Sequence, residues 1–169
     1  KKIFHKLKDP EEFSHVSWSE LLVYTIRQAM YLRHGPVASA MASYRQVNDE
    51  DAALETPYGT VFIPISLDRN ALRYLLREAF DPFHWHHFDS AETPVDTGDV
   101  VVDCGPSEGL WALTIAGRVK KIYLIEPQRG FVRVLHKTFA ELITAGIVEV
   151  LNCAVGSCDG ACVLSSTGE

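Results

Sequence analysis

The chain has 169 residues, of which 47% are hydrophobic and 22% charged, a composition typical of a soluble globular protein. Its net charge of −6, without a basic stripe, argues against a nucleic-acid partner. No apolar run approaches the ~20 residues needed to span a membrane, and the first residues lack the apolar core of a signal peptide. The sequence therefore predicts a cytoplasmic protein with no membrane partner and with its four cysteines reduced.

Residues 1–55 are expected to form a helical N-terminal extension. A helix over 17–34 begins with an S-x-x-E capping box and ends at a Gly-Pro pair. A second helix, rich in Ala and Ser, is expected over 36–47. The polar segment NDEDAALETP, 48–57, is expected to be a connection.

The segment that follows is predicted to contain one strand and two helices. GTVFIPI, 59–65, alternates β-forming residues after a Pro-Tyr-Gly turn and is typical of a strand. Asp68 is expected to cap a helix over 69–79. The Asp-Pro pair at 81–82 is expected to start a short helix that reaches about residue 90.

This short helix contains a histidine cluster, His84, His86 and His87, which has three interpretations. His84 and His87 are i, i+3 neighbours that a metal ion can bridge. The helix can instead pack its aromatic side chains inward with the histidines at its margin, or it can line a ligand pocket through His84 or Trp85. We favour the packed helix and expect no metal site.

After residue 98 the pattern changes to alternating apolar strands and helices. The expected strands are 99–104, 121–126, 147–155 and 161–166, and the expected helices are 108–116 and 131–143. The first two strands are continuous apolar runs, the pattern of strands that are buried on both faces. This alternation predicts a parallel sheet with right-handed crossovers, an α/β, Rossmann-like fold.

Acidic residues and glycines stand at the ends of the first two of these strands. Asp103, Gly105 and Gly109 come at the carboxyl end of the first strand, and Glu126 ends the second. Open α/β sheets bind ligands at this edge, where glycines let a ligand approach the backbone and an acid can accept hydrogen bonds from ribose hydroxyls. Each residue alone is also explained as a turn or packing glycine, a cap, or a solvated strand end. Their joint position on two adjacent strands predicts a nucleoside pocket.

The glycine spacing bears on the kind of nucleoside. The dinucleotide fingerprint is G-x-G-x-x-G, and Ser107 stands where its middle glycine would seat a pyrophosphate. The pattern D-x-G-x-x-x-G suits a ligand without phosphates, which argues against an NAD(P)-dependent oxidoreductase. That class stays an alternative, as does a non-catalytic Rossmann-like module for binding or assembly.

VVVDCGPSEG at 100–109, followed by IYLIEP, resembles the S-adenosylmethionine-dependent methyltransferases of the FkbM type. TPYGTVFIPI, VDTGDVVVDCG and NCAVG resemble the same family, so the resemblance covers residues 56–169. It implies the N-terminal part of a class I methyltransferase domain. The family commonly has Ala-Asn where this chain has Pro106 and Ser107, although Ser107 keeps a short polar side chain.

The resemblance implies S-adenosylmethionine as the cofactor and a role for each matching residue. Glu126 would hold the ribose hydroxyls. The loop beside the methionine part of the cofactor would consist of Asp103, Gly105, Pro106, Ser107 and Gly109. The residues implied near the adenine are Pro127 and Gln128 on one side and Asn152, Cys153 and Ala154 on the other.

The implied reaction is O-methylation of a sugar, a glycan or a secondary metabolite, so we expect a small-molecule or glycan acceptor. The family's domain continues beyond the position that corresponds to Glu169, and the general base is expected in that continuation. A sheet that is cut short leaves strand edges unpaired, which favours association. We therefore expect either a truncated domain that forms a homodimer or a fragment trimmed from a longer chain.

Overall fold

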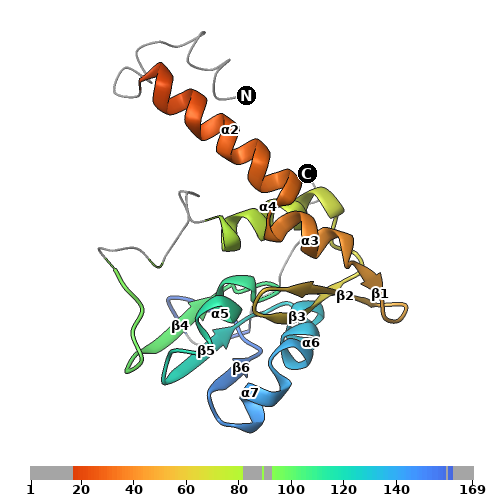
Figure 1. Ribbon diagram of the computed structural model, residues 1–169. Coiled ribbons are helices and arrows are strands. Elements are labelled where there is room, and N and C mark those ends of the chain that lie inside the picture. Colours follow the sequence, from red (N-terminus) through yellow and green to blue (C-terminus); the bar gives the residue numbers. More distant parts are fainter. Residues whose placement is uncertain (1–16, 82–88, 90–92, 159, 162–169) are drawn as a thin grey trace.

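The computed structural model describes residues 17–81, 89, 93–158 and 160–161. These residues form two three-stranded sheets, one antiparallel and one parallel, with helices packed against them (Figure 1). None of the described helices is both long and apolar enough to cross a bilayer.

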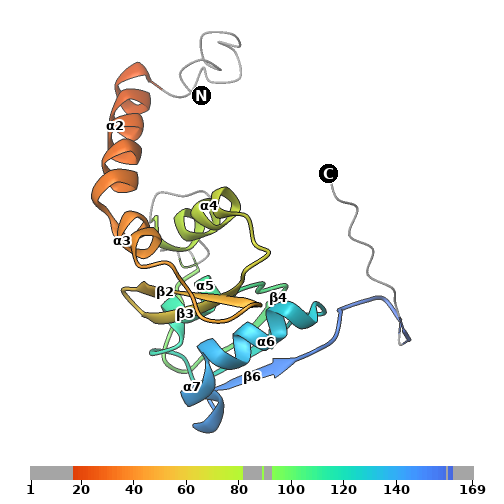
Figure 2. The ribbon, with the colours of Figure 1, turned by 90° about the vertical axis from the view of Figure 1, so that its right-hand side faces the viewer.

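Helix α2, Trp18–His34, begins as the sequence predicts. The Ser17 N–H donates to Glu20 Oε2 at 2.8 Å, and the Glu20 N–H donates to Ser17 Oγ at 3.2 Å. This reciprocal pairing is the predicted capping box. The helix extends away from the two sheets (Figures 1 and 2), which leaves Leu22 and Ile26 about half exposed.

Helix α3, Pro36–Ala42, is shorter than predicted. The Glu55 N–H donates to Ser43 Oγ at 2.8 Å, which ties the end of the helix to a strand. The chain then continues as the short strand β1, Arg45–Gln46, instead of as helix.

The prediction of a polar connection at 48–57 is wrong, because Asp51–Thr56 forms strand β2. It pairs antiparallel with β1 on one side and with β3, Gly59–Pro64, on the other. The strand at β3 is as predicted. The side chains from Ala52 to Leu54 are fully buried, so packing rather than an alternating pattern makes this segment a strand. The β2–β3 hairpin lies across residue 55, where we expect the boundary between extension and domain.

Helix α4, Arg69–Phe80, confirms the predicted helix and its cap. Asp68 Oδ1 accepts the N–H groups of Asn70 at 2.9 Å and of Ala71 at 3.1 Å. The predicted helix after residue 81 and its histidine cluster lie outside the described residues.

The second sheet is parallel, with the strand order β4-β5-β6. Its strands are β4 Val100–Cys104, β5 Lys121–Ile125 and β6 Val148–Leu151. Strand β6 is shorter than predicted, and the strand predicted at 161–166 lies almost wholly outside the described residues. The α/β, Rossmann-like class that the sequence predicts is confirmed by this sheet and its helical crossovers.

Strand β4 is not buried on both faces as predicted. Val100 is 56% exposed and Val102 is 57% exposed. Among the described residues β4 pairs only with β5, so it is the outer strand of the sheet. Val100 and Val102 are two residues apart and therefore point to the same face of the strand, so it is this face that is exposed, and the apolar run does not report burial here.

The helices of this half are α5 Leu110–Ile115, α6 Arg129–Thr138 and α7 Ala140–Thr144. The single long helix predicted over 131–143 is divided at Phe139, whose φ and ψ of −104° and 17° depart from helical values. The Phe139 side chain is fully buried. The apolar pattern that predicts a single helix is therefore shared by two helices with a bend between them.

Helix α6 joins the two sheets. It lies under the β2–β3 hairpin on the side opposite α3 and α4 (Figure 2). The Phe62 N–H of β3 donates to Thr138 Oγ1 at 3.0 Å. The buried Asp51 of β2 accepts hydrogen bonds from Arg133 at 2.8 Å and from Lys137 at 2.5 Å.

Candidate nucleoside-binding site

The β4–α5 loop, which carries D-x-G-x-x-x-G, has an unusual backbone. Gly105, Ser107 and Gly109 have φ angles of +80°, +50° and +76°. The Gly105 N–H donates to the Ile125 carbonyl at 2.9 Å, and the Gly109 N–H donates to the Pro106 carbonyl at 2.8 Å. The loop is therefore a tight turn closed on itself and anchored to strand β5.

Glu126 lies directly beyond β5 and beneath this loop. It is only 2% exposed. Its Oε2 accepts the Ser107 N–H at 3.2 Å, and its Oε1 accepts the Gln128 N–H at 2.8 Å. Each carboxylate oxygen keeps a further lone pair. The two strand ends that the sequence singles out are thus connected by a hydrogen bond.

Gly109 is confined by side chains as well as by its φ angle. A Cβ atom at this position would lie 2.7 Å from both Leu135 Cδ2 and Phe139 Cε2. Gly105 has no atom within 4 Å of its corresponding position. The first glycine therefore serves the turn and leaves space beside the backbone, whereas the second lets α5 pack closely on α6.

The carboxyl groups of Asp103, Glu108 and Glu126 lie around the loop, near enough to influence one another's charge. Burial, with repulsion from Glu126, raises the pKa of Asp103 to about 6. Burial also raises the pKa of Glu108 to about 7, against the lowering effect of a hydrogen bond from its own backbone, and repulsion from Glu78, Asp103 and Glu126 adds to the increase. Negative charge is therefore costly to add here, and a positive charge would be stabilised.

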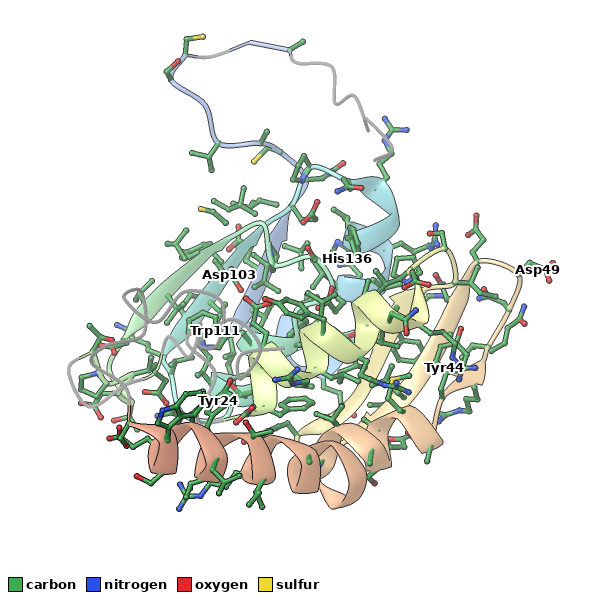
Figure 3. All side chains as sticks on the ribbon, turned by 90° about the horizontal axis from the view of Figure 1, so that it is seen from above. Tyr24, Tyr44, Asp49, Asp103, Trp111 and His136 are labelled. Atoms are coloured by element: carbon green, nitrogen blue, oxygen red, sulfur yellow. The ribbon has the colours of Figure 1, made fainter. Side chains whose placement is uncertain are left out.

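A cavity of about 140 Å³ opens between α4 and the loop. Its lining residues come from both elements: Leu75, Glu78, Ala79, Asp103, Gly105, Pro106, Ser107, Glu108, Leu110 and Trp111. Figure 3 shows Asp103 and Trp111 on one side of the molecule and Asp49 at the far end.

The residues implied for the adenine side lie at the ends of β5 and β6. Asn152 Nδ2 donates to the carbonyls of Glu126 at 2.9 Å and of Pro127 at 3.1 Å. This brings Asn152 to Pro127, at the start of α6. Gln128, Cys153 and Ala154 are exposed at the same edge. The structure thus brings the implied residues together at the carboxyl ends of the parallel strands. Glu126 lies between them and the β4–α5 loop.

Glu108 is the site residue that sequence reasoning missed. It is 3% exposed, and its Oε2 has no hydrogen-bond partner. An acid just before a helix is usually solvated, whereas Glu108 is buried beside a cavity that it lines together with residues of α4. Its position inside the D-x-G-x-x-x-G motif is the one signal that pointed to it.

Metal binding and cysteine chemistry were considered for the part of the chain that the structure describes. No three side chains of His, Cys, Asp or Glu come together there as a metal-binding group. Cys104, Cys153 and Cys158 are free and exposed.

No model of a protein family and no curated protein matches the chain. Among solved structures, it is similar to the methyltransferase FkbM from Methylobacillus flagellatus KT, with 25% identity and a TM-score of 0.35 over 41% of this chain and 20% of that one. It is similar to M. jannaschii TYW2 in complex with AdoMet, with 15% identity and a TM-score of 0.42 over 63% and 45%. It is also similar to spermidine synthase from Thermotoga maritima, with 17% identity and a TM-score of 0.31 over 65% and 39%. The chain spans less than half the length of each of these proteins.

Proposed function

We propose that the chain is the N-terminal part of an S-adenosylmethionine-dependent methyltransferase of the FkbM type. The observation that carries the proposal is the carboxylate of Glu126, held below the D-x-G-x-x-x-G loop by the Ser107 and Gln128 N–H groups. Both of its oxygens retain acceptor capacity for the two ribose hydroxyls. Opening of the Ser107 contact, the longer of the two, would admit the ribose.

The charge of the loop distinguishes this cofactor from a dinucleotide. Asp103, Glu108 and Glu126 surround the loop, and among the described residues the lining of its cavity contains no Lys, Arg or His. A pyrophosphate would meet repulsion at this place. S-adenosylmethionine carries no phosphate and has a sulfonium and an ammonium group, so the same carboxylates attract it. This favours the methyltransferase over the NAD(P)-dependent alternative.

S-adenosylmethionine supplies a methyl group that its sulfonium already activates, so the protein mainly has to orient the reactants and exclude water. In this assignment Asp103 and Gly105 lie beside the methionine part. Glu126 orients the ribose, and Pro127 with Asn152 borders the adenine. We further propose that the acceptor is a hydroxyl of a sugar, a glycan or a secondary metabolite, that the protein works in the cytoplasm, and that it forms a homodimer.

Calorimetric titration with S-adenosylmethionine, S-adenosylhomocysteine and NAD tests the proposal. Both adenosyl ligands should bind, and NAD should not. Glu126→Gln keeps the shape of the side chain but removes its charge and one acceptor oxygen, so it should weaken adenosyl binding about tenfold or more. Glu141→Gln on α7, an exposed acid away from the loop, is the matched control and should bind as the unchanged protein does.

Binding of NAD alone would overturn the assignment. Binding of none of the three ligands by folded protein would favour the alternative of a non-catalytic module. The acceptor class is a separate question, answered by methyl transfer from labelled S-adenosylmethionine to hydroxyl-bearing candidates.

A further inference from the structure

The outer edge of strand β3 is only partly covered. The Phe62 N–H points away from β2 and donates to Thr138 Oγ1 at 3.0 Å. In an antiparallel pair, residues two apart direct their backbone groups to the same side, so the Thr60 N–H and carbonyl also point away from β2. Among the described residues neither of these two groups has a hydrogen-bond partner. Thr138 therefore closes this edge at Phe62 and leaves it open at Thr60.

A cavity of about 500 Å³ lies beside this open edge. Thr60 and Phe62 belong to one wall, and the end of α5 with the bend between α6 and α7 forms the other. Small residues line this second wall, namely Ala116, Gly117 and Ala140. A Cβ atom at Gly117 would have no neighbour within 4 Å. The space beside the edge is therefore open to another chain segment.

This cavity is separate from the one at the β4–α5 loop. Helix α5 begins at Leu110, which lines the cavity at the loop, and the present cavity lies beyond its other end, at Ala116 and Gly117. The two cavities share no lining residue. A ligand at the β3 edge would therefore leave the proposed cofactor contacts free.

The charges of the cavity favour a basic ligand. Lys137 donates to the buried Asp51, so its charge is neutralised within the protein. Glu141 is exposed, and none of the ion pairs between described residues involves it. The ring of Tyr58, stacked on Phe80 with 5.7 Å between centroids, is 52% exposed and offers an aromatic face to a cation.

We propose that this cavity binds an extended peptide segment of a partner protein, which adds to β3 as an antiparallel strand. The peptide would donate N–H groups to the carbonyls of Thr60 and Phe62 and accept the Thr60 N–H. Side chains alternate along a strand, so one set would pack on Phe62 and Leu113 while the other lies near Glu141. The segment is therefore one of alternating apolar and basic residues, a partner beyond the proposed function.

The test is an NMR titration of the chain with the capped peptide acetyl-Val-Lys-Val-Lys-Val-amide at physiological salt, in which the Thr60 and Gly117 amides are followed. The expected Kd is on the order of 0.1 mM, because the contact is small and uses few hydrogen bonds. The same peptide methylated on its backbone nitrogens cannot donate to the edge and should bind about tenfold more weakly or less. Equal binding of the two peptides would rule out strand addition.

A substitution that fills the cavity gives the second arm. Gly117→Leu should weaken peptide binding about tenfold or more, because its side chain would occupy the space beside Thr60. The φ of Gly117 lies outside the left-handed region and its surroundings are open, so the variant should fold. Gly98→Leu is the matched control, equally open but outside the cavity lining, and should bind the peptide normally. Thermal unfolding checks both variants, and unchanged affinity in Gly117→Leu would contradict the proposal.

The charge preference is tested separately from the shape of the cavity. Glu141→Gln should weaken binding of the lysine peptide about threefold or more, since it removes the unpaired charge. Asp49→Asn removes the same charge from an exposed residue outside the lining and should leave binding unchanged. If acetyl-Val-Glu-Val-Glu-Val-amide bound as tightly as the lysine peptide, the partner would not be basic and the proposal would be wrong.

Sedimentation velocity with and without the lysine peptide distinguishes a separate partner from a second copy of this chain. The peptide should leave the mass of the sedimenting species unchanged. Dissociation of a dimer by the peptide would show that a second copy occupies the β3 edge and would overturn the proposal. Saturation with S-adenosylhomocysteine should not alter peptide affinity, because the two cavities share no residue.

Discussion

Ser107 shows how single residues shape this site. Its φ of +50° is uncommon for a residue with a side chain, and its N–H donates to Glu126 Oε2. Strained backbone of this kind persists where neighbouring contacts hold it, and it is concentrated at functional sites. The acid after β5 therefore shapes the loop after β4 before any ligand arrives.

The two motif glycines allow a prediction at this scale. Gly109→Ala should destabilise the protein by about 2–4 kcal/mol, because the new methyl group adds a clash with Leu135 and Phe139 to the strain of a positive φ. Gly105→Ala carries the positive φ without the clash and should lose about 1–2 kcal/mol. Urea unfolding of both variants measures the difference. Equal losses would show that α5 and α6 move apart freely, contrary to the packing described.

The acids of the site were predictable only in part. Asp103 and Glu126 are recognisable because each ends an apolar strand, and strand ends of a parallel sheet meet at one edge. Glu108 has no such position, and it lines its cavity together with α4, an element more than 25 residues earlier in the chain. Local pattern describes a residue's own element and does not report what packs on it from elsewhere.

Among the elements, β2 shows where pattern reading fails. Its sequence DAALET neither alternates nor contains β-branched residues before its last position, yet its first four residues are buried. Pairing with β1 and β3 supplies its backbone hydrogen bonds, and α6 supplies partners for Asp51. By contrast, α2 and α4 were predictable because their caps are local hydrogen bonds written in adjacent residues.

The Asp51 cluster supports a prediction about how α6 is attached to the hairpin. Asp51→Asn should destabilise the protein by about 2–4 kcal/mol, because it leaves Arg133 and Lys137 without their shared, buried carboxylate. The exposed pair of Arg45 and Glu55 is the control, and Glu55→Gln should have little effect. Thermal unfolding of both variants gives the comparison. A neutral Asp51→Asn would mean that apolar packing alone holds α6 in place.

Asp51 also makes the attachment sensitive to acid. Burial tends to raise the pKa of Asp51, but hydrogen bonds and charges from Arg133 and Lys137 outweigh it and lower the pKa below 3.8. A group with a depressed folded-state pKa contributes stability above its unfolded pKa and loses it as pH falls. The contribution of Asp51 is therefore complete at neutral pH and is lost progressively as pH falls below 3.8.

At the scale of the whole molecule, the two sheets differ in how their edges are covered. The Thr138 hydroxyl of α6 accepts a hydrogen bond from β3. Strand β4 pairs on one side only, among the described residues, and presents Val100 and Val102 to the surface. An exposed apolar edge strand is a template for pairing with another chain.

This edge leads to a prediction about assembly. The protein should associate through β4, and Val100→Lys with Val102→Lys should weaken the association, because paired lysines repel across such an edge. Val47→Lys, at another exposed valine just after β1, should leave it unchanged. Sedimentation velocity over a wide concentration range gives the mass of the species. A protein that stays monomeric throughout would contradict the prediction.

The sequence by itself determined the parallel α/β half, the capped helices, and the motif whose loop adjoins Glu126, because periodicity, caps and strand ends are local properties of a chain. The tertiary structure decided that DAALET is a strand, that β4 is an edge, and that Glu108 is a buried acid facing a cavity. These features depend on what packs against each segment. Burial and pairing between segments that are far apart in the sequence decide these features, and a local pattern does not indicate which distant element packs against a segment.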